Sequence, residues 1–159
     1  MFFSMIAAMS LSTGQCPVER AHYALRTMPG VTARFLRVSV TEDWPVGLAL
    51  RMDFAATGRS YWWLPWNGGT NGHQNLASTP DPATPGWRPM AVRPLGDIEW
   101  ITADADYAVL EAVPRHGDDA PAHFLIPNLR RAMWYRTPQD RREGTTKQFF
   151  DLVRCDPPA

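Results

Sequence analysis

The residues best suited to chemistry lie in one stretch, in which a run of aromatic side chains leads directly into glycines, amides and one histidine. The side chains there that could contact a ligand are Trp62, Trp63, Trp66, Asn67, Asn71, His73, Gln74 and Asn75. Flat aromatic rings stack against uncharged ligands, and amide groups both donate and accept hydrogen bonds. This combination suits saccharides and other neutral polar ligands. We therefore predict a ligand site at this stretch.

Trp62 and Trp63 are neighbours in residues 60–64, whose aromatic composition predicts a β-strand. Successive side chains of a strand point to opposite faces of its sheet. One indole ring must therefore enter the core, while the other faces solvent, a loop or a ligand. A purely structural alternative is that the following loop folds back and covers the second ring.

Catalysis has less support in the sequence. The motifs Gly-x-Ser-x-Gly, His-Glu-x-x-His and Cys-x-x-Cys are absent, and so is a phosphate-binding loop. His22 and His123 fall in predicted strands and are interpreted as structural. His73 and the turn 116–119, His-Gly-Asp-Asp, fall in predicted loops, so a small hydrolase built from these loops is an alternative. We expect no cofactor and no metal ion.

The first residues resemble an export signal. Residues 1–12 are apolar and uncharged, and the first charged residue is Glu19. The run is too short to cross a bilayer as a helix but fits the apolar part of a signal peptide, although no Lys or Arg precedes it. We predict a signal peptide at residues 1–14, cleaved after Ser12 or Gly14, and a single β-rich domain at residues 15–159. Lipidation of Cys16 is a weaker alternative, because Gln15 replaces the usual small residue.

Two cysteines support the same location. Cys16 follows the predicted cleavage site, and Cys155 lies four residues from the end of the sequence. Because the ends of a domain often lie close together, we predict a disulfide between them in a periplasmic or secreted protein. The alternative is a pair of buried thiols in a cytosolic protein.

Charge excludes several classes of partner. The chain has 159 residues with 16 basic and 16 acidic side chains, so its formal net charge is zero. A general nucleic-acid binder needs a basic excess, so we expect no nucleic acid as partner. The balance also argues against a polybasic membrane-surface protein. We do not expect an integral membrane protein.

The elements that must position these residues are mostly short strands. Strict alternation of apolar and polar residues predicts a strand at 47–55, and similar patterns predict strands at 22–27, 32–40, 60–64, 96–102, 107–113, 122–126 and 145–155. Residues 67–94 are predicted to be one long polar loop, and Asn128 to cap a short helix that ends at Arg136. The predicted fold is all-β and mainly antiparallel: a sandwich or barrel of about eight strands.

The function that agrees best with these features is non-catalytic binding. We predict an exported β domain that binds a neutral, saccharide-like ligand or a partner protein through Trp62, Trp63 and residues 67–75. The alternatives are the small hydrolase and a secreted inhibitor or immunity-type protein whose exposed aromatic residues enter a partner.

Overall fold

Ten β-strands form one sheet in the computed structural model, which describes residues 16–68, 72–89 and 92–159. The strands are β1 (Ala21–Leu25), β2 (Met28–Arg37), β3 (Leu48–Phe54), β4 (Arg59–Trp66), β5 (Asn75–Thr79), β6 (Asp97–Glu99), β7 (Ile101–Ala103), β8 (Val109–Leu110), β9 (His123–Leu125) and β10 (Phe150–Cys155). Helical segments are η1 (Val18–Arg20), α1 (Leu129–Tyr135) and η2 (Gln139–Arg141). The predicted signal peptide and Asn71 lie outside the described residues.

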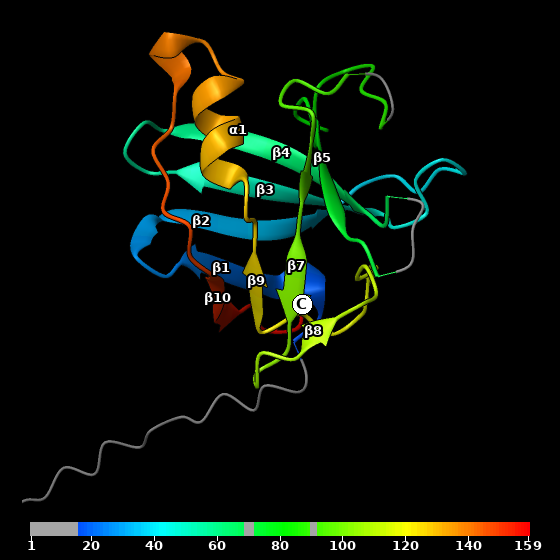
Figure 1. Ribbon diagram of the computed structural model, residues 1–159. Helices are drawn as coiled ribbons and strands as arrows, with labels where there is room; N and C mark the ends of the chain where they lie inside the picture. The colour runs from blue at the N-terminus through cyan, green and yellow to red at the C-terminus, as the bar shows by residue number, and fades with distance from the viewer. Residues whose placement is uncertain (1–15, 69–71, 90–91) are drawn as a thin grey trace, which may run out of the picture.

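The sheet closes on itself through one bent segment. Its strand order is β6-β5-β4-β3-β2-β1-β10-β9-β7-β8, and only Trp100 separates β6 from β7. Strand β6 pairs with β5, whereas β7 pairs with β9. The Trp100 N–H donates to the Gln74 carbonyl at 2.9 Å at the bend. The ring of strands is therefore complete, and Figure 1 shows β7 and β9 standing at a steep angle to β1 and β2. Of the two predicted arrangements, the curled sheet is a barrel.

Alternation along each strand separates an inner from an outer layer. In β3, Leu48, Leu50, Met52 and Phe54 belong to the main core, as the sequence pattern predicts. Large aromatic rings from other strands fill the same interior: Tyr23, Phe35, Trp63, Trp100, Phe124 and Phe150. A smaller cluster, Trp44, Ala49, Leu64 and Ala77, lies on the other face of β3–β5, with Trp66 and Trp87 packed against it.

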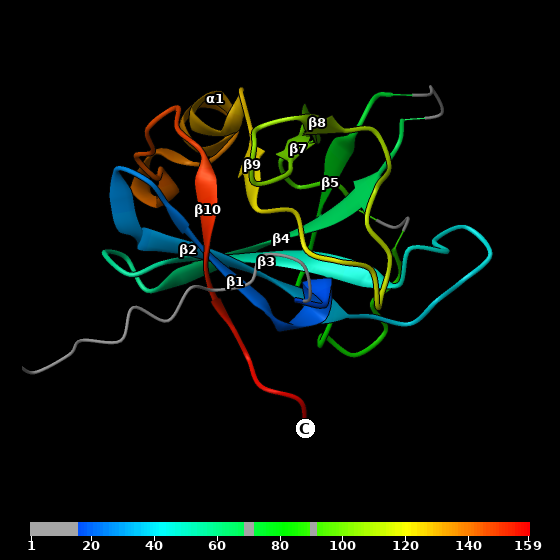
Figure 2. The same cartoon turned by 90° about the horizontal axis from the view of Figure 1, so that it is seen from below.

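Helix α1 and the chain after it close one end of the barrel. Leu129, Ala132 and Met133 of α1 pack into the main core. The buried Glu143 carboxylate accepts hydrogen bonds from the Thr57 hydroxyl at 2.8 Å and from the Tyr61 hydroxyl at 3.2 Å. Burial raises the pKa of the Tyr61 hydroxyl, and the charge of Glu143 adds to this effect. Figure 2, seen from below, shows α1 beside this end of the curled sheet.

Several predicted boundaries were wrong. The predicted loop 67–94 contains β5, whose Asn-Leu-Ala-Ser-Thr sequence has little strand propensity but pairs with β4 and β6. The predicted strand 107–113 is reduced to Val109–Leu110, because Tyr107 has a φ of 63°, which ends extended structure. The last strand begins at Phe150 rather than 145.

The short helix is present, but its predicted cap is not. Asn128 occupies the N-cap position of α1, yet its side chain makes no capping hydrogen bond. Its backbone carbonyl instead accepts a hydrogen bond from the Ala132 N–H at 3.0 Å. Packing of the apolar face of α1 against the core therefore holds this seven-residue helix in place.

The two cysteines form the predicted disulfide. Cys16 and Cys155 are bonded, with their Cα atoms 5.9 Å apart and a sequence separation of 139. Strand β1 pairs with β10, and Ala21 lies opposite Cys155, so the sheet brings the two ends of the domain together. Within the described ranges, no helix is long and apolar enough to span a membrane.

Candidate functional site

The two neighbouring indole rings of β4 point to opposite faces of the sheet, as predicted. Trp63 is fully buried in the barrel interior, where it belongs to the main core. Trp62 is half-buried on the outer face, with the Arg51 guanidinium 5.3 Å from its ring centroid. Trp63 therefore cannot be part of a surface ligand site, and its inclusion in the predicted site was wrong. Alternation of side chains on β4 explains the difference.

Trp62 lines a groove on the outer face of the sheet. The groove encloses about 670 Å³ and is formed by Leu36, Arg37, Val38, Ser39, Val40, Trp62, Asp81, Pro82, Ala83 and Trp87. The chain after β5 folds back here, and the Trp87 indole N–H donates to the Thr79 hydroxyl at 2.7 Å. This segment folds back beside Trp62 and leaves the ring partly exposed, so the loop covers the second indole in part.

Trp66 lies four residues further on and lines a different hollow. This hollow, the barrel mouth, encloses about 580 Å³. Its lining residues are Asp43, Trp44, Pro45, Val46, Trp66, Asn67, Gly72, Glu111, Ala112, Val113, Arg115 and Asp118. They come from the β2–β3 loop, the last residue of β4 with the loop after it, and the chain between β8 and β9. The predicted site is therefore divided between the outer groove and the mouth.

The mouth combines aromatic walls with hydrogen-bonding groups. The indole Nε1 atoms of Trp44 and Trp66 are buried and have no hydrogen-bond partner among the described residues. The carboxylates of Asp43, Glu111 and Asp118 outnumber the single guanidinium of the lining, so the mouth is net negative. A hollow of this kind disfavours anions but offers acceptors to hydroxyl groups.

The remaining residues of the predicted site have separate surroundings. Gln74 is buried, and its side-chain N–H₂ donates to the carbonyls of Leu110 at 2.6 Å and Ala112 at 3.2 Å. Its side-chain oxygen accepts a hydrogen bond from the Thr102 hydroxyl at 3.0 Å. Gln74 thus fastens β8 to the barrel and has little capacity left for a ligand. Asn75 begins β5 and is half-buried. His73 is exposed and lines neither the groove nor the mouth.

In the loops of the hydrolase alternative, His116 contacts a carboxylate from outside them, Glu19. His116 Nε2 lies 3.4 Å from Glu19 Oε1, and both side chains are partly exposed. Partial burial would raise the pKa of the Glu19 carboxyl, but hydrogen bonds from its own N–H and that of Gly117, together with His116, lower it overall. Among residues 16–68, 72–89 and 92–159, no group of three or more His, Cys, Asp or Glu side chains could hold a metal ion.

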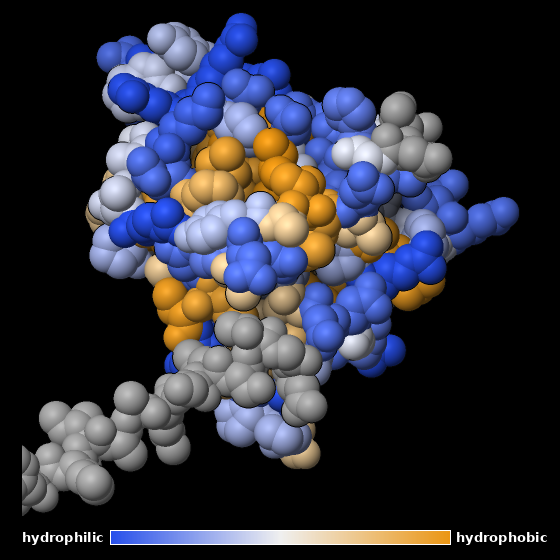
Figure 3. Space-filling model, turned by 60° about the horizontal axis from the view of Figure 1, so that its bottom comes forward, coloured by the Kyte–Doolittle hydropathy of each residue, from blue (hydrophilic) through white to orange (hydrophobic). Residues whose placement is uncertain are grey.

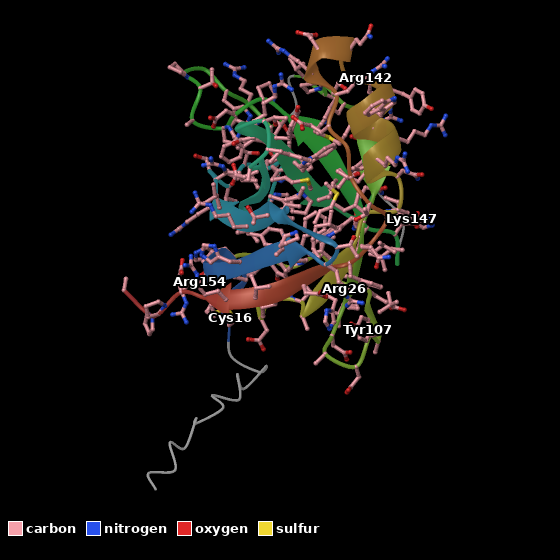
Figure 4. All side chains as sticks on the ribbon, turned by 90° about the vertical axis from the view of Figure 1, so that its left-hand side faces the viewer. Cys16, Arg26, Tyr107, Arg142, Lys147 and Arg154 are labelled. Carbon is pink, nitrogen blue, oxygen red and sulfur yellow. A yellow bond between two sulfur atoms is a disulfide. The ribbon has the colours of Figure 1, made fainter. Side chains whose placement is uncertain are left out.

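A polar cluster that sequence reasoning missed joins His123 of β9 and Asp151 of β10 to Arg26, just after β1, and to Tyr107, between β7 and β8. Asp151 accepts hydrogen bonds from Arg26 Nε at 2.9 Å and Arg26 Nη2 at 2.8 Å. His123 Nδ1 lies 2.7 Å from Asp151 Oδ1, and the Tyr107 ring stacks on His123 with centroids 4.2 Å apart. The Tyr107 hydroxyl also accepts a hydrogen bond from Arg26, and Figure 4 shows these two labelled side chains together. Hydrogen bonds from Arg26 and then His123 lower the pKa of Asp151 against the effect of its partial burial.

This cluster orients a histidine but supplies it with no nucleophile. In the described part of the chain, no Ser, Thr or Cys side chain is hydrogen-bonded to His123. A catalytic Asp–His pair needs a nucleophile or an activated water in reach of the free ring nitrogen. The cluster instead links β9 and β10 to the turn after β1 through charge-assisted hydrogen bonds. No sequence pattern predicts this cluster, because the pairing of His123 with Asp151 depends on the register of β9 against β10.

Apolar surface is present near β8. Val109 and Leu110 of β8 are exposed, and so is Val153 of β10. Figure 3, in which the lower side of Figure 1 is turned forward, shows apolar surface framed by hydrophilic residues. Scattered exposed aliphatic side chains are common on folded proteins. They do not by themselves define a site.

Comparison with known proteins finds no family model, no curated protein and no solved structure that matches this chain. Its function therefore has to be argued from the chemistry of its own surfaces.

Proposed function

We propose that the protein is an exported, non-catalytic binding domain that holds a neutral, saccharide-like ligand in the barrel mouth. One observation carries the proposal: the fold brings Trp66 and Asn67 into one hollow with the acidic chain at 111–118. These segments are far apart in the sequence, and the opposite end of the barrel is closed by α1. The mouth of a barrel is a common place for small-molecule sites.

The lining groups match the chemistry of a sugar. The C–H faces of a pyranose ring pack against a flat indole ring, which the partly exposed Trp66 supplies, while the buried Trp44 belongs to the cluster on which Trp66 packs. Sugar hydroxyls donate to carboxylates, which Asp43, Glu111 and Asp118 supply. A neutral ligand also avoids the repulsion that the net negative lining exerts on an anion.

Export is supported by the disulfide. Stable disulfides form in oxidising compartments and are rare in most cytosolic proteins. The Cys16–Cys155 bond joins the two ends of the domain, and the apolar residues 1–12 precede it in the sequence. A periplasmic or secreted location agrees with both features.

The test follows the tryptophan indole N–H signals by nuclear magnetic resonance. The full chain is titrated with neutral trisaccharides of glucose, mannose, galactose and N-acetylglucosamine. We expect at least one of them to shift the signals of Trp44 and Trp66, while Trp134 on α1 stays unchanged. Glu111→Gln or Asn67→Ala should weaken binding about tenfold, through loss of one hydrogen bond to the ligand.

Asp140→Asn is the matched control, because it removes an exposed carboxylate from η2 at the closed end. It should leave the affinity unchanged. Shifts confined to Trp62 would move the site to the outer groove and contradict the proposal. The absence of any shift at millimolar sugar would also contradict it.

A further inference from the structure

Positive charge is concentrated at the closed end of the barrel. Residues 127–147, which include α1 and η2, contain six basic and two acidic side chains, a net charge of +4. The rest of the chain therefore carries −4, because the total is zero. The balanced composition conceals this asymmetry. Because the charge is unevenly distributed, a net charge of zero is no argument against a membrane-surface protein.

Cations and aromatic rings share one surface there, which we call the α1 surface. It surrounds a hollow of about 430 Å³ lined by Pro127, Arg130, Arg131, Trp134, Tyr135 and Lys147. Trp134 is 42% exposed and Tyr135 75% exposed. The Arg142 guanidinium lies 5.4 Å from the Trp134 ring centroid. Figure 4 shows Arg142 and Lys147 on the side that carries α1, away from Cys16.

Three cations of the α1 surface lack an acidic partner among the described residues. In the described parts of the chain, no ion pair joins Arg130, Arg131 or Lys147 to a carboxylate. Their mutual repulsion is therefore not offset within the protein. A multiply charged anionic partner would offset it. The molecule has no other described hollow in which several unpaired cations and two exposed aromatic rings occur together.

We propose that the α1 surface binds a bilayer that contains anionic phospholipid. Arg130, Arg131 and Lys147 would contact lipid phosphates at the hollow, and the Trp134 and Tyr135 rings would lie at the boundary between headgroups and acyl chains. Trp and Tyr favour that boundary because each has an apolar ring and a polar group. The net negative remainder of the protein would face away from the membrane and leave the barrel mouth open to solvent.

A bilayer explains the exposed rings better than a soluble polyanion does. Neutralising the cations requires only negative charge, which a soluble polymer could supply. Trp134 and Tyr135 are adjacent, large and exposed beside those cations, and burial of their apolar area requires an apolar phase. A lipid surface provides both features at once.

The test is sedimentation of the full chain with vesicles. Phosphatidylcholine vesicles with 30% phosphatidylglycerol are compared with vesicles of pure phosphatidylcholine. The triple variant R130Q/R131Q/K147Q should lower partitioning onto the anionic vesicles roughly 100-fold, since each basic residue near such a surface contributes roughly fivefold. Added salt should weaken binding of the unmodified chain.

The matched control is R37Q/R88Q/R115Q, which removes the same charge from three exposed arginines elsewhere. It should lower binding much less. The apolar residues 1–12 are present in every variant, and the pure phosphatidylcholine vesicles measure their contribution. Equal losses in the two triple variants, or binding that does not depend on phosphatidylglycerol, would overturn the proposal.

A second measurement tests whether the Trp134 ring lies at the bilayer boundary. Lipids brominated on their acyl chains quench tryptophans at the bilayer boundary, and the quenching should disappear in Trp134→Phe. Quenching that persists in this variant would contradict the proposed orientation. Binding to soluble heparin without binding to the anionic vesicles would overturn the lipid proposal in favour of a soluble polyanion.

Discussion

Trp62 and Trp63 occupy neighbouring positions in β4 but have opposite surroundings. The indole ring of Trp63 is fully buried among the aromatic residues of the barrel interior. The ring of Trp62 borders the outer groove and is covered in part by Arg51. Replacing either ring removes the same atoms. The difference between the free-energy costs of the two replacements therefore reflects only the different surroundings of the two rings.

We predict that Trp63→Ala lowers the free energy of unfolding by about 3–5 kcal/mol, because buried contacts are lost and a cavity remains. Trp62→Ala should cost about 1 kcal/mol, through lost partial burial and the cation–π contact with Arg51. Chemical denaturation of both single variants measures the difference. Equal large losses would mean that Trp62 is as buried in solution as Trp63.

Side-chain alternation predicted that the two rings separate, but not which one is inside. That choice depends on which face of β4 meets the core, and only the pairing with β3 decides it: Leu50 lies opposite Trp63, and Arg51 opposite Trp62. The polar cluster, too, depends on strand pairing that the local sequence does not contain. Asp151 and His123 lie 28 residues apart and come together only through the register of two strands.

Strand β8 is held in place by a side chain from outside its own hairpin. It has two residues and pairs with β7, while Gln74 donates to the carbonyls of Leu110, in β8, and of Ala112, just after it. A strand this short has few hydrogen bonds of its own. Much of its stability therefore depends on Gln74.

Gln74→Ala should lower the free energy of unfolding by about 2 kcal/mol, because it removes hydrogen bonds to the Leu110 and Ala112 carbonyls and one from the buried Thr102 hydroxyl, which keeps only a longer contact of 3.4 Å with the Leu110 carbonyl. Hydrogen exchange of the amides at 104–113 should accelerate more than exchange in β3. Gln139→Ala, in the exposed η2, is the control and should change neither quantity. Unchanged exchange at 104–113 in Gln74→Ala would show that β8 does not depend on this contact.

The sequence indicated elements best where one face is apolar and the other polar. Residues 47–55 show this alternation over a full strand, and β3 lies there. Strand β5 lacks it, because Ser78 and Thr79 are buried polar residues and Ala77 is small. Its formation depends on partners on both sides, β4 and β6, which a local pattern does not contain. For the same reason, the mouth could not be predicted as the meeting point of three loops.

The Cys16–Cys155 disulfide joins the two ends of the domain. The bond spans 139 residues, so it restricts almost the entire described chain in the unfolded state. In the chain-entropy model, such a long closed loop contributes about 4–5 kcal/mol to stability. This contribution is comparable to the total stability of many domains.

We predict that reduction with dithiothreitol, or the double variant Cys16→Ser/Cys155→Ser, lowers the free energy of unfolding by about 4–5 kcal/mol. Denaturation with and without the reductant gives the difference. Thiol titration of the denatured, unreduced protein from its native host should detect no free thiol. Two free thiols there would contradict both the bond and the proposed export.

The same bond determines how the molecule responds to a mechanical pull on its two ends. Tension enters at Cys16 and leaves at Cys155, so the covalent sulfur bridge carries it and the hydrogen bonds between strands do not. While the bridge is intact, the barrel cannot be unravelled by stretching the chain ends. Once it is reduced, the 139-residue segment can lengthen to roughly 45 nm when fully extended. Reduction of the disulfide would thus allow a domain that resists stretching to extend under force.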